Sequence, residues 1–387
     1  MPGDDGWPMA QPASLTFRPS PAMTLGVEVE LQIIDPLSRD LTPRAPELVA
    51  RLADDRRIKP ELLQSMIEVC TGVCDNVGQV HDDLGESMQR LRACGRDLGL
   101  VFSSAGSHPF ARWAERIVSE GERYRMLIDR NRWLARRLMV FGLHVHVGMR
   151  DGEHAVAMLN GFLPYVPHVL ALSASSPYWQ GTDTGLASSR VTLFEALPTA
   201  GHPCTFPSWP AYQALYGAMS RSRAVTSVKD FWWDIRLHPD LGTVELRICD
   251  SLSTLSETIA MVALIQCLYR SLDEEYRAGR TFAPPPDWIV RENKWRASRW
   301  GLEAEIVLDG EGRTGGLRQE FAHLLPALEP VAASLHCGQE LRRVSQMIGG
   351  VPSAGRQRQV FDRTRQLEAV VDAMTQEFAT DQPWAPG

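Results

Sequence analysis

One pattern recurs three times in this chain and constrains its fold more than any other: two polar side chains two residues apart, each flanked by apolar residues. The pairs are Glu28 and Glu30, His144 and His146, and Glu245 and Arg247. A spacing of two puts both members of a pair on the same face of a β-strand. Each predicted strand therefore packs its Val, Leu and Ile side chains on a core and presents acidic, imidazole or guanidinium groups on its other face.

Helical patterns separate these strands. The runs with strand character cover residues 24–34, 64–71, 98–104, 139–149, 231–237 and 243–249. Helical spacing covers 47–52, a run from residue 77, 120–137, 155–173, 255–279, 317–347 and 358–378. Residues 238–242 carry the turn chemistry of a tight hairpin, and residues 176–209 are expected to form a long loop. This order favours the α+β class with a largely antiparallel sheet.

Composition excludes several broad classes of protein. Hydrophobic residues make up 44% of the 387 residues, enough for a sizeable core, and the uninterrupted apolar runs are too short to span a membrane. A net charge of −7 argues against a dedicated nucleic-acid binder. The seven scattered cysteines form no Cys-x-x-Cys pair, which favours free thiols in a reducing cytoplasm.

We expect one domain. Residues 1–22 carry five prolines and are predicted to be a disordered lead-in, residues 23–380 a single domain, and residues 381–387 a tail. The chain lacks the phosphate-loop, dinucleotide-binding, nucleophile-elbow and H-E-x-x-H motifs. A phosphate-loop ATPase, a Rossmann dehydrogenase, an α/β-hydrolase and a zincin are therefore disfavoured.

The polar pairs could form one binding surface if their strands share one sheet. Glu68, and Glu61 just upstream, would then join Glu28 and Glu30 on one concave surface. Each pair of like charges about 4 Å apart costs on the order of 4 kcal/mol, so such a surface needs protons or bound cations. Carboxylates with an imidazole suit Mg²⁺ or Mn²⁺. Arg247 beside Glu245 would suit a phosphate or a carboxylate.

Each pair could also have a purely structural role. A Glu-x-Glu pair is often a solvated sheet face, a His-x-His pair is often structural, and a Glu-x-Arg pair is often a cross-strand salt bridge. The spacing alone does not make the strands neighbours.

Several longer stretches resemble the bacterial glutamate–cysteine ligase type 2 family, the carboxylate–amine ligase branch of the glutamine-synthetase-like superfamily. The resemblance runs in consistent order over residues 23–375. It rests on residues 24–32 (TLGVEVELQ), 142–148 (GLHVHVG), 198–201 (PTAG), 231–236 (FWWDIR), 242–247 (GTVELR) and 292–301 (ENKWRASRWG).

The resemblance implies a curved, mostly antiparallel sheet that forms a funnel, with helices packed outside. It also implies two or three divalent ions, usually Mg²⁺. The metal ligands implied by motif position are Glu28, Glu30, Glu61, Glu68, Glu245 and His144. His144 is also implied to contact phosphate, His146 to contact nucleotide or substrate, and Arg247 to contact a phosphoryl group or a substrate carboxylate.

A further set of polar residues follows from the last motif. Asn293, Arg296 and Arg299 are three residues apart on a predicted helix, so they are expected to share a face and clamp phosphates, unless that face is simply solvated. Arg190 is a weaker candidate for a substrate contact.

The activity implied is that of an ATP-dependent ligase that joins glutamate to an amine, cysteine being the obvious one, through an acyl phosphate. A guanidino-kinase-like phosphotransferase and a non-catalytic nucleotide- or amino-acid-binding protein remain alternatives. The expected partners are these small molecules, with no nucleic acid and no membrane. The long apolar C-terminal helices offer a face for a homodimer.

Overall fold

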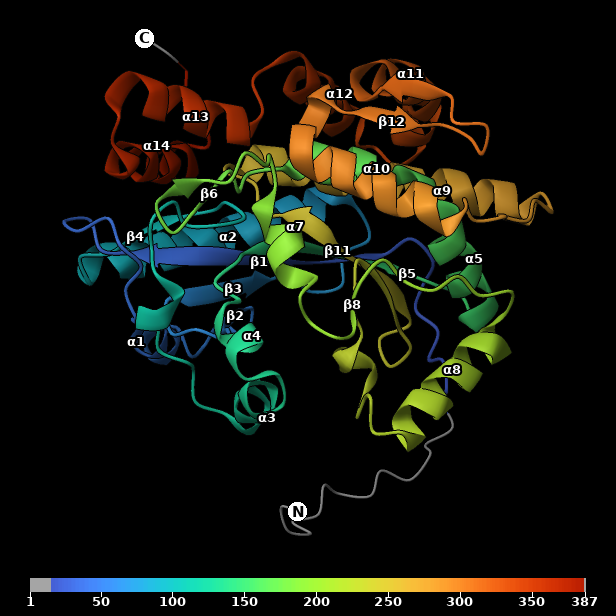
Figure 1. Ribbon diagram of the computed structural model, residues 1–387, viewed down its shortest axis with the longest axis horizontal. Helices are drawn as coiled ribbons and strands as arrows, with labels where there is room; N and C mark the ends of the chain where they lie inside the picture. Colours follow the sequence, from blue (N-terminus) through green and yellow to red (C-terminus); the bar gives the residue numbers. More distant parts are fainter. Residues whose placement is uncertain (1–14, 386–387) are drawn as a thin grey trace.

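The computed structural model describes residues 15–385, and its centre is an open sheet of seven antiparallel strands (Figure 1). The strand order is β10-β11-β5-β1-β3-β2, with β4 paired to the far end of β1. The bounds are β1 (Leu25–Ile34), β2 (Ile58–Pro60), β3 (Met66–Cys70), β4 (Val101–Ser103), β5 (Gly142–Gly148), β10 (Ile235–His238) and β11 (Thr243–Asp250). The predicted α+β class and antiparallel sheet are confirmed.

Three two-stranded sheets lie outside the main one. They pair β6 (Tyr178–Trp179) with β7 (Thr182–Asp183), β8 (Ala200–Gly201) with β9 (Trp232–Trp233), and β12 (Glu305–Val307) with β13 (Thr314–Gly316). Only the β8–β9 pair is parallel among the described strands. It joins the loop after residue 197 to the segment that leads into β10.

Apolar side chains alternate along the strands and bury one face of the main sheet. Val27, Val29, Val145 and Val147 are fully or almost fully buried, because helices cover that face. The helices in contact with it are α2 (Val77–Asp97), α5 (Gly152–Phe162), α6 (Val166–Ser173) and α9 (Leu255–Arg277). Side-chain caps start two of them, since Asn76 accepts from the amide of Gln79 and Thr254 from that of Glu257.

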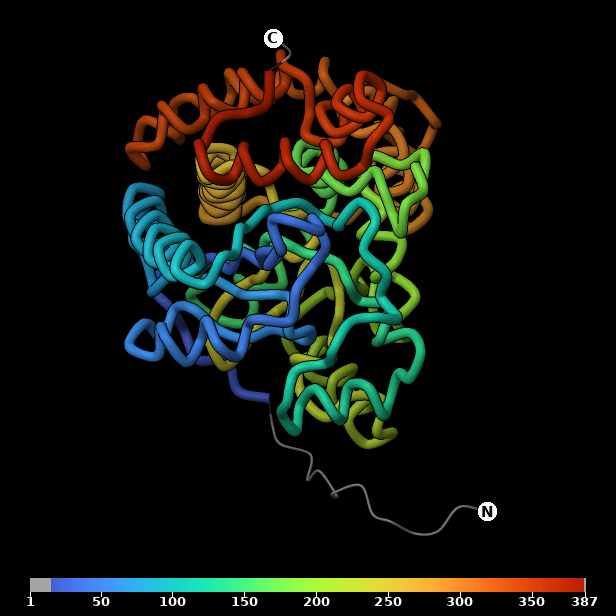
Figure 2. Tube along the Cα trace, turned by 90° about the vertical axis from the view of Figure 1, so that its left-hand side faces the viewer, coloured from blue at the N-terminus to red at the C-terminus, as the bar shows by residue number. Residues whose placement is uncertain are grey.

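The remaining helices form an outer layer and a rim. The outer layer contains α10 (Asp287–Trp300), α11 (Leu317–Ser334), α12 (Gly338–Gly349), α13 (Ser353–Thr364) and α14 (Leu367–Thr380). Figure 2 shows these C-terminal helices, orange to red, stacked beyond α9. The others are α1 (Ala45–Arg51), α3 (Glu122–Asn131), α4 (Trp133–Arg136), α7 (Ser189–Phe194) and α8 (Trp209–Arg221). In Figure 1, α3 and α4 lie on the side of the sheet opposite α2 and α9.

Some predicted boundaries differ from the structure. Residues 120–137 form two helices, because Arg132 adopts a positive φ of 49°. Residues 317–347 are likewise split near His336, whose φ is 56°. The expected loop 176–209 contains α7 and short strands, and α8 begins at its end. The apolar run 155–173 belongs to α5 and α6, joined by a short 3-10 turn at Pro164.

The two ends of the predicted domain also extend further than expected. Residues 1–14 of the predicted disordered lead-in lie outside the described residues. Residues 15–22 run beside the sheet, where Arg18 donates its amide to Pro239 and Ser20 to Met149. At the other end, Asp381 accepts from Ser256 at the start of α9. Residues 15–22 therefore pack against the domain that was predicted to begin at Met23.

One segment is long and apolar enough to cross a membrane. It covers residues 152–173, and 83% of its most apolar window is buried inside the described structure. That degree of burial is typical of the core helix of a globular domain, and α5 and α6 occupy this position here.

Candidate active site

The strand register brings the three polar pairs onto one face of the main sheet. Glu28 of β1 lies opposite His144 of β5, and Glu30 lies opposite Glu68 of β3. Glu245 of β11 lies opposite His146. The hypothesis that these strands are neighbours is therefore correct, and the polar face points away from α2 and α9.

This face forms the floor of a cavity of about 500 Å³, which we call the polar basin. Most of the predicted site residues line it: Glu28, Glu30, Glu61, Glu68, His144, His146, Arg190 and Arg247. They come from β1, β3, β5, β11, α7 and the loop before β3, so the site draws on more than half the length of the chain.

The carboxylates gather on the β1–β3 side of the polar basin. Ligand atoms of Glu30, Glu61 and Glu68 lie within 4.8 Å of one another. Burial, and then the neighbouring carboxylates, raise the pKa of Glu30 and that of Glu68 to about 8. Burial also raises the pKa of Glu61. These carboxyl groups therefore hold protons readily unless a cation compensates their charge.

Glu28 has the opposite character. Its Oε2 lies 3.2 Å from Nδ1 of His144 and its Oε1 lies 3.6 Å from Nε2 of His146. Burial alone would raise the pKa of Glu28, but the two imidazoles outweigh burial and hold it well below its usual range. Glu28 is thus an ionised carboxylate at the centre of the floor.

The donor set fits divalent cations. Two further groups of converging ligand atoms combine Glu28 with His146 and Glu245, and Glu28 with Glu68 and Cys70. Oxygen-rich sets with an occasional imidazole suit Mg²⁺ and Mn²⁺. The raised pKa of Glu30 and of Glu68 points the same way, because burial and neighbouring carboxylates outweigh the nearby cations Lys59, Arg190 and Arg247.

Cationic groups gather on the β10–β11 side. Both oxygens of Glu245 accept from arginines, Oε2 from Nε of Arg236 at 2.8 Å and Oε1 from Arg247. Burial would raise the pKa of Glu245, but the two guanidinium groups outweigh burial and lower it. Glu245 is fully buried and does not line the basin. Its geometry is that of an anchor for two arginines, and it would bind a metal only by sharing an oxygen with them.

Arg190 lies beside Arg247 on the floor. Its guanidinium donates to the carbonyl oxygens of Arg247 and Ile248 at 3.2 to 3.3 Å. Gly142 permits this approach, since a Cβ at that position would collide with the Arg190 guanidinium. The buried Nε atoms of Arg190 and Arg247 have no hydrogen-bond partner among the described residues. Two cationic groups with spare donors therefore face the carboxylates across the basin.

The structure does not bring the predicted phosphate clamp on α10 to the basin. The side chain of Asn293 is buried and exchanges two hydrogen bonds with the backbone of Val307. Arg296 pairs with Glu292 and donates to the carbonyl of Glu305, and Arg299 donates to the carbonyl of Gly185. The predicted helix is correct, but these three side chains serve packing contacts of α10 and do not share a free face.

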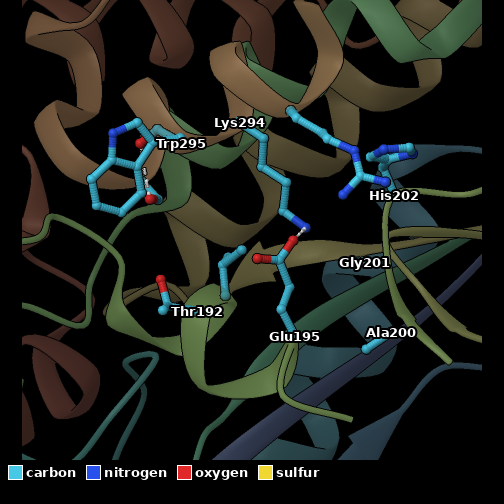
Figure 3. A pocket seen from close by; sticks show the side chains of 10 residues that line it. Thr192, Glu195, Ala200, Gly201, His202, Lys294 and Trp295 are labelled. Carbon is cyan, nitrogen blue, oxygen red and sulfur yellow. Dashed lines mark hydrogen bonds and ion pairs between the residues drawn. The ribbon is translucent and has the colours of Figure 1, made fainter. Parts of the chain in front are cut away.

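The same motif instead contributes Lys294 to a second cavity of about 300 Å³. Figure 3 shows Lys294 reaching from α10 to Glu195. Its ammonium also lies 2.6 Å from Asp234, which comes from the segment before β10. Lys294 and Asp234 are both buried, so this ion cluster ties α10 to the loops on which β8 and β9 lie.

Several polar residues in or beside the basin were given no site role by the sequence interpretation. Arg236 and His238 form another pair two residues apart, on β10, and Cys70 lies two residues from Glu68. The rule that found the other pairs would have found these. Cys70 donates to Glu68 at 3.0 Å and lies 3.1 Å from Nζ of Lys59, with its pKa raised by burial. Three rim residues carry no local signal, Arg123, Tyr124 and Lys229, whereas Trp232 lies within the matched stretch 231–236.

Comparisons with known proteins agree on one family. The model of a family described as Glutamate-cysteine ligase family 2 matches residues 24–376. The chain is 44% identical over 375 residues to a protein of Bdellovibrio bacteriovorus, covering 96% of this chain and 99% of that relative. It is 43% identical over 371 residues to a protein of Gloeobacter violaceus, covering 95% and 100%. Both relatives carry the name "Putative glutamate--cysteine ligase 2".

Two solved structures share the fold. The glutamate–cysteine ligase of Francisella tularensis, solved in complex with AMP, aligns with a TM-score of 0.64 at 12% identity, over 94% of this chain and 90% of that one. A bifunctional glutathione synthetase from Pasteurella multocida aligns with a TM-score of 0.61 at 13% identity, over 93% and 52%. At these identities the likeness concerns the fold, which is the glutamine-synthetase-like fold predicted from the resemblance.

Proposed function

The chain belongs to glutamate–cysteine ligase family 2, and from that membership we propose that this ATP-dependent carboxylate–amine ligase activates the γ-carboxylate of glutamate and joins it to an amine. The observation that supports the proposal best is the division of the polar basin. Four carboxylates line one side, and Arg190 and Arg247 face them from the other. ATP and glutamate are both anionic, so they meet only where positive charge compensates their repulsion.

The carboxylate side would hold Mg²⁺. Its ligands are Glu28, Glu30, Glu61 and Glu68, with the imidazole of His144 beside them. Bound ions supply positive charge that offsets the repulsion between a polyphosphate and a carboxylate. The number of ions in the proposal is two or three.

The cationic side would bind the anionic groups of the substrates. Arg247 is held by Glu245, and Arg190 by two backbone carbonyls, so neither guanidinium has to be ordered when the substrate binds. His146 lies between Glu28 and Glu245. A hydrogen bond between its Nδ1 and the hydroxyl of Thr243 fixes its ring at the base of the basin. We assign it a contact with nucleotide or substrate.

The proposed reaction has two steps. The γ-phosphoryl group of ATP passes to the glutamate carboxylate, which forms an acyl phosphate and releases ADP. The amine nitrogen then attacks the acyl carbon, so that a C–N bond forms, the C–O bond to phosphate breaks, and phosphate leaves with the electron pair while the nitrogen loses a proton. No covalent intermediate on the enzyme is needed.

The test measures ADP released from ATP in the presence of glutamate, Mg²⁺ and hydroxylamine. Hydroxylamine is a small amine, and its product, γ-glutamyl hydroxamate, is measured directly. We expect Glu28→Gln and Arg247→Gln to lower kcat by about 10²-fold or more, the usual cost of removing a charge-stabilising group. Glu292→Gln, on the outer face of α10, is the control and should leave turnover unchanged.

Three outcomes would refute the proposal. Turnover that the Glu28→Gln enzyme retains in full would remove the carboxylates from the chemistry. A stable phosphorylated product that no amine captures would favour a phosphotransferase. Tight binding of MgATP without turnover on any amine would favour a binding protein.

A further inference from the structure

A third cavity, of about 300 Å³ and distinct from the one that Lys294 lines, lies beside the polar basin, and we call it the side pocket. One face of α3 forms one wall, and the segments 197–199 and 226–232 form the other. The residues that matter below are Arg123, Met126 and Leu127 on α3, and Leu197, Lys229 and Trp232 opposite them.

The side pocket and the polar basin are adjacent cavities. Arg123, Leu127, Lys229 and Trp232 line both cavities. A molecule in the side pocket would therefore lie next to the basin.

Some charges of the side pocket are engaged, and the free ones among the described residues are the cations Arg123 and Lys229 and the exposed carboxylate of Glu122. The carboxylate of Asp230 accepts from the backbone and hydroxyl of Thr226 and from the backbone of Ser227. Arg130 donates to the carbonyl of Ala224. By contrast, no hydrogen bond or ion pair with a described residue engages the guanidinium of Arg123 or the ammonium of Lys229. Two cations thus remain available at the junction of the two cavities.

The rest of the side pocket is largely apolar. Leu197 is buried, Leu127 and Trp232 are partly buried, and Met126 remains 40% exposed at the opening. Half-covered apolar walls of this size suit the apolar body of a ligand. The residues of the side pocket contribute to none of the three groups of converging metal ligands among the described residues. Two cationic side chains without a metal site suit a ligand that carries one carboxylate.

Resting on the function proposed above, we propose that the side pocket selects the amine acceptor. The acceptor is an α-amino acid or short peptide with an apolar side chain larger than that of cysteine. Its carboxylate lies at Arg123 and Lys229, its side chain lies against Met126, Leu127 and Trp232, and its amine points into the basin. The acceptor differs from cysteine because the thiol-bearing side chain leaves most of the apolar wall uncovered.

The first test compares acceptors on the wild-type enzyme with MgATP and glutamate. The panel pairs L-leucine with 3-methylbutylamine and L-phenylalanine with phenethylamine, each pair differing by the carboxylate, and adds L-cysteine and hydroxylamine. We expect kcat/KM for leucine or phenylalanine to exceed that for cysteine, and that for the matched decarboxylated amine, by about tenfold or more. A higher kcat/KM for cysteine, or equal values within each pair, would overturn the assignment.

The second test uses exposed positions, where substitutions leave the core intact. Lys229→Gln should lower the ratio of kcat/KM for leucine to that for hydroxylamine by about tenfold, because it removes one of the two carboxylate partners. Met126→Trp should lower the same ratio for phenylalanine by filling the opening. Arg125→Gln is the matched control, since Arg125 is an exposed cation on the same helix that lines neither cavity.

The nucleotide is the rival occupant. If Lys229→Gln and Met126→Trp raise KM for ATP and leave the acceptor ratios unchanged, the side pocket holds the nucleotide and the assignment fails. If the wild-type enzyme releases no ADP with glutamate and hydroxylamine, the proposed function fails instead. In that case calorimetry with L-phenylalanine and MgADP decides about the side pocket: binding that Met126→Trp abolishes supports it, and no binding to the wild type overturns it.

Discussion

Glu30 and Glu68 are two carboxyl groups whose surroundings oppose ionisation. Burial and neighbouring carboxylates raise the pKa of each to about 8, from a usual value of 4.5. A carboxyl group with a raised pKa in the folded state stabilises the protein while it is protonated, below about pH 4.5, and this contribution disappears as the pH rises through about 8. A divalent cation reverses the preference, because it binds the ionised form.

We therefore expect metal-free protein to lose thermal stability as the pH rises from about 5 to about 8, relative to protein with millimolar Mn²⁺. The difference between the two Tm values should grow with pH. Glu68→Gln should shrink that difference, and Glu292→Gln should not. A difference that is constant across the range would contradict the assignment of the carboxylates to a cation site.

Glu245 and Glu28 are both predicted metal ligands, yet their surroundings differ. Glu245 is the sole carboxylate bonded to the buried guanidinium groups of Arg236 and Arg247 among the described residues. Glu245→Gln should cost about 3–5 kcal/mol in the free energy of unfolding, because it leaves two cations without a counter-charge. Glu28→Gln should cost about 1 kcal/mol, since an amide still bonds to the imidazoles. Urea denaturation of both variants measures this contrast, and equal losses would refute it.

At the scale of elements, Asn293 joins α10 to β12. Its amide exchanges two hydrogen bonds with Val307, at 2.8 and 2.7 Å. Asn293→Ala should lower the free energy of unfolding by about 1–3 kcal/mol, because both backbone groups of Val307 lose their partner. KM for ATP should stay unchanged. A raised KM for ATP at unchanged stability would instead restore Asn293 to the predicted phosphate clamp.

The strands were easier to predict from the sequence than the breaks between helices. Period-two alternation predicted β1, β3, β5 and β11, because each has one face on the core and one face toward the basin. The breaks at Arg132 and His336 escaped prediction, since these residues take a positive φ without the usual glycine signal. The side chains of the predicted clamp on α10 bond elsewhere for a different reason: a spacing of three predicts a shared face, but not whether that face meets solvent, a ligand or another strand.

The site itself was more predictable than its rim. The floor residues lie on strands, where spacing reports the face. The rim residues Arg123 and Lys229 lie on a charged helix and in a short turn, and they meet only through tertiary packing. Nothing in their local sequence distinguishes them from solvated surface charges.

At the scale of the whole molecule, a buried ion cluster holds the C-terminal layer in place. Arg356 of α13 donates to Glu257 of α9 at 2.9 Å and to Glu377 of α14 at 2.6 Å, and all three side chains are buried. Arg356→Met should cost about 3–5 kcal/mol, because two carboxylates lose their cation.

Hydrogen exchange locates that loss. Amides of α13 and α14 should exchange faster in Arg356→Met than in the wild type, while those of β1 and β5 keep their protection. Arg358→Met, whose partner Asp183 is at the surface, is the matched control and should change little. Equal exchange in both variants would show that other contacts hold this layer.

The floor of the basin is assembled from strands that are distant along the chain, from β1 near its start to β11 after residue 243. A genetic crossover between those codons separates Glu28 from Arg247, so a hybrid chain draws the two sides of the floor from different parents. The side pocket depends on one helix and two short segments, which point substitutions reshape without touching the inherited strands. If the side pocket selects the acceptor as proposed, single-codon changes in and around α3 are enough to change the acceptor preference.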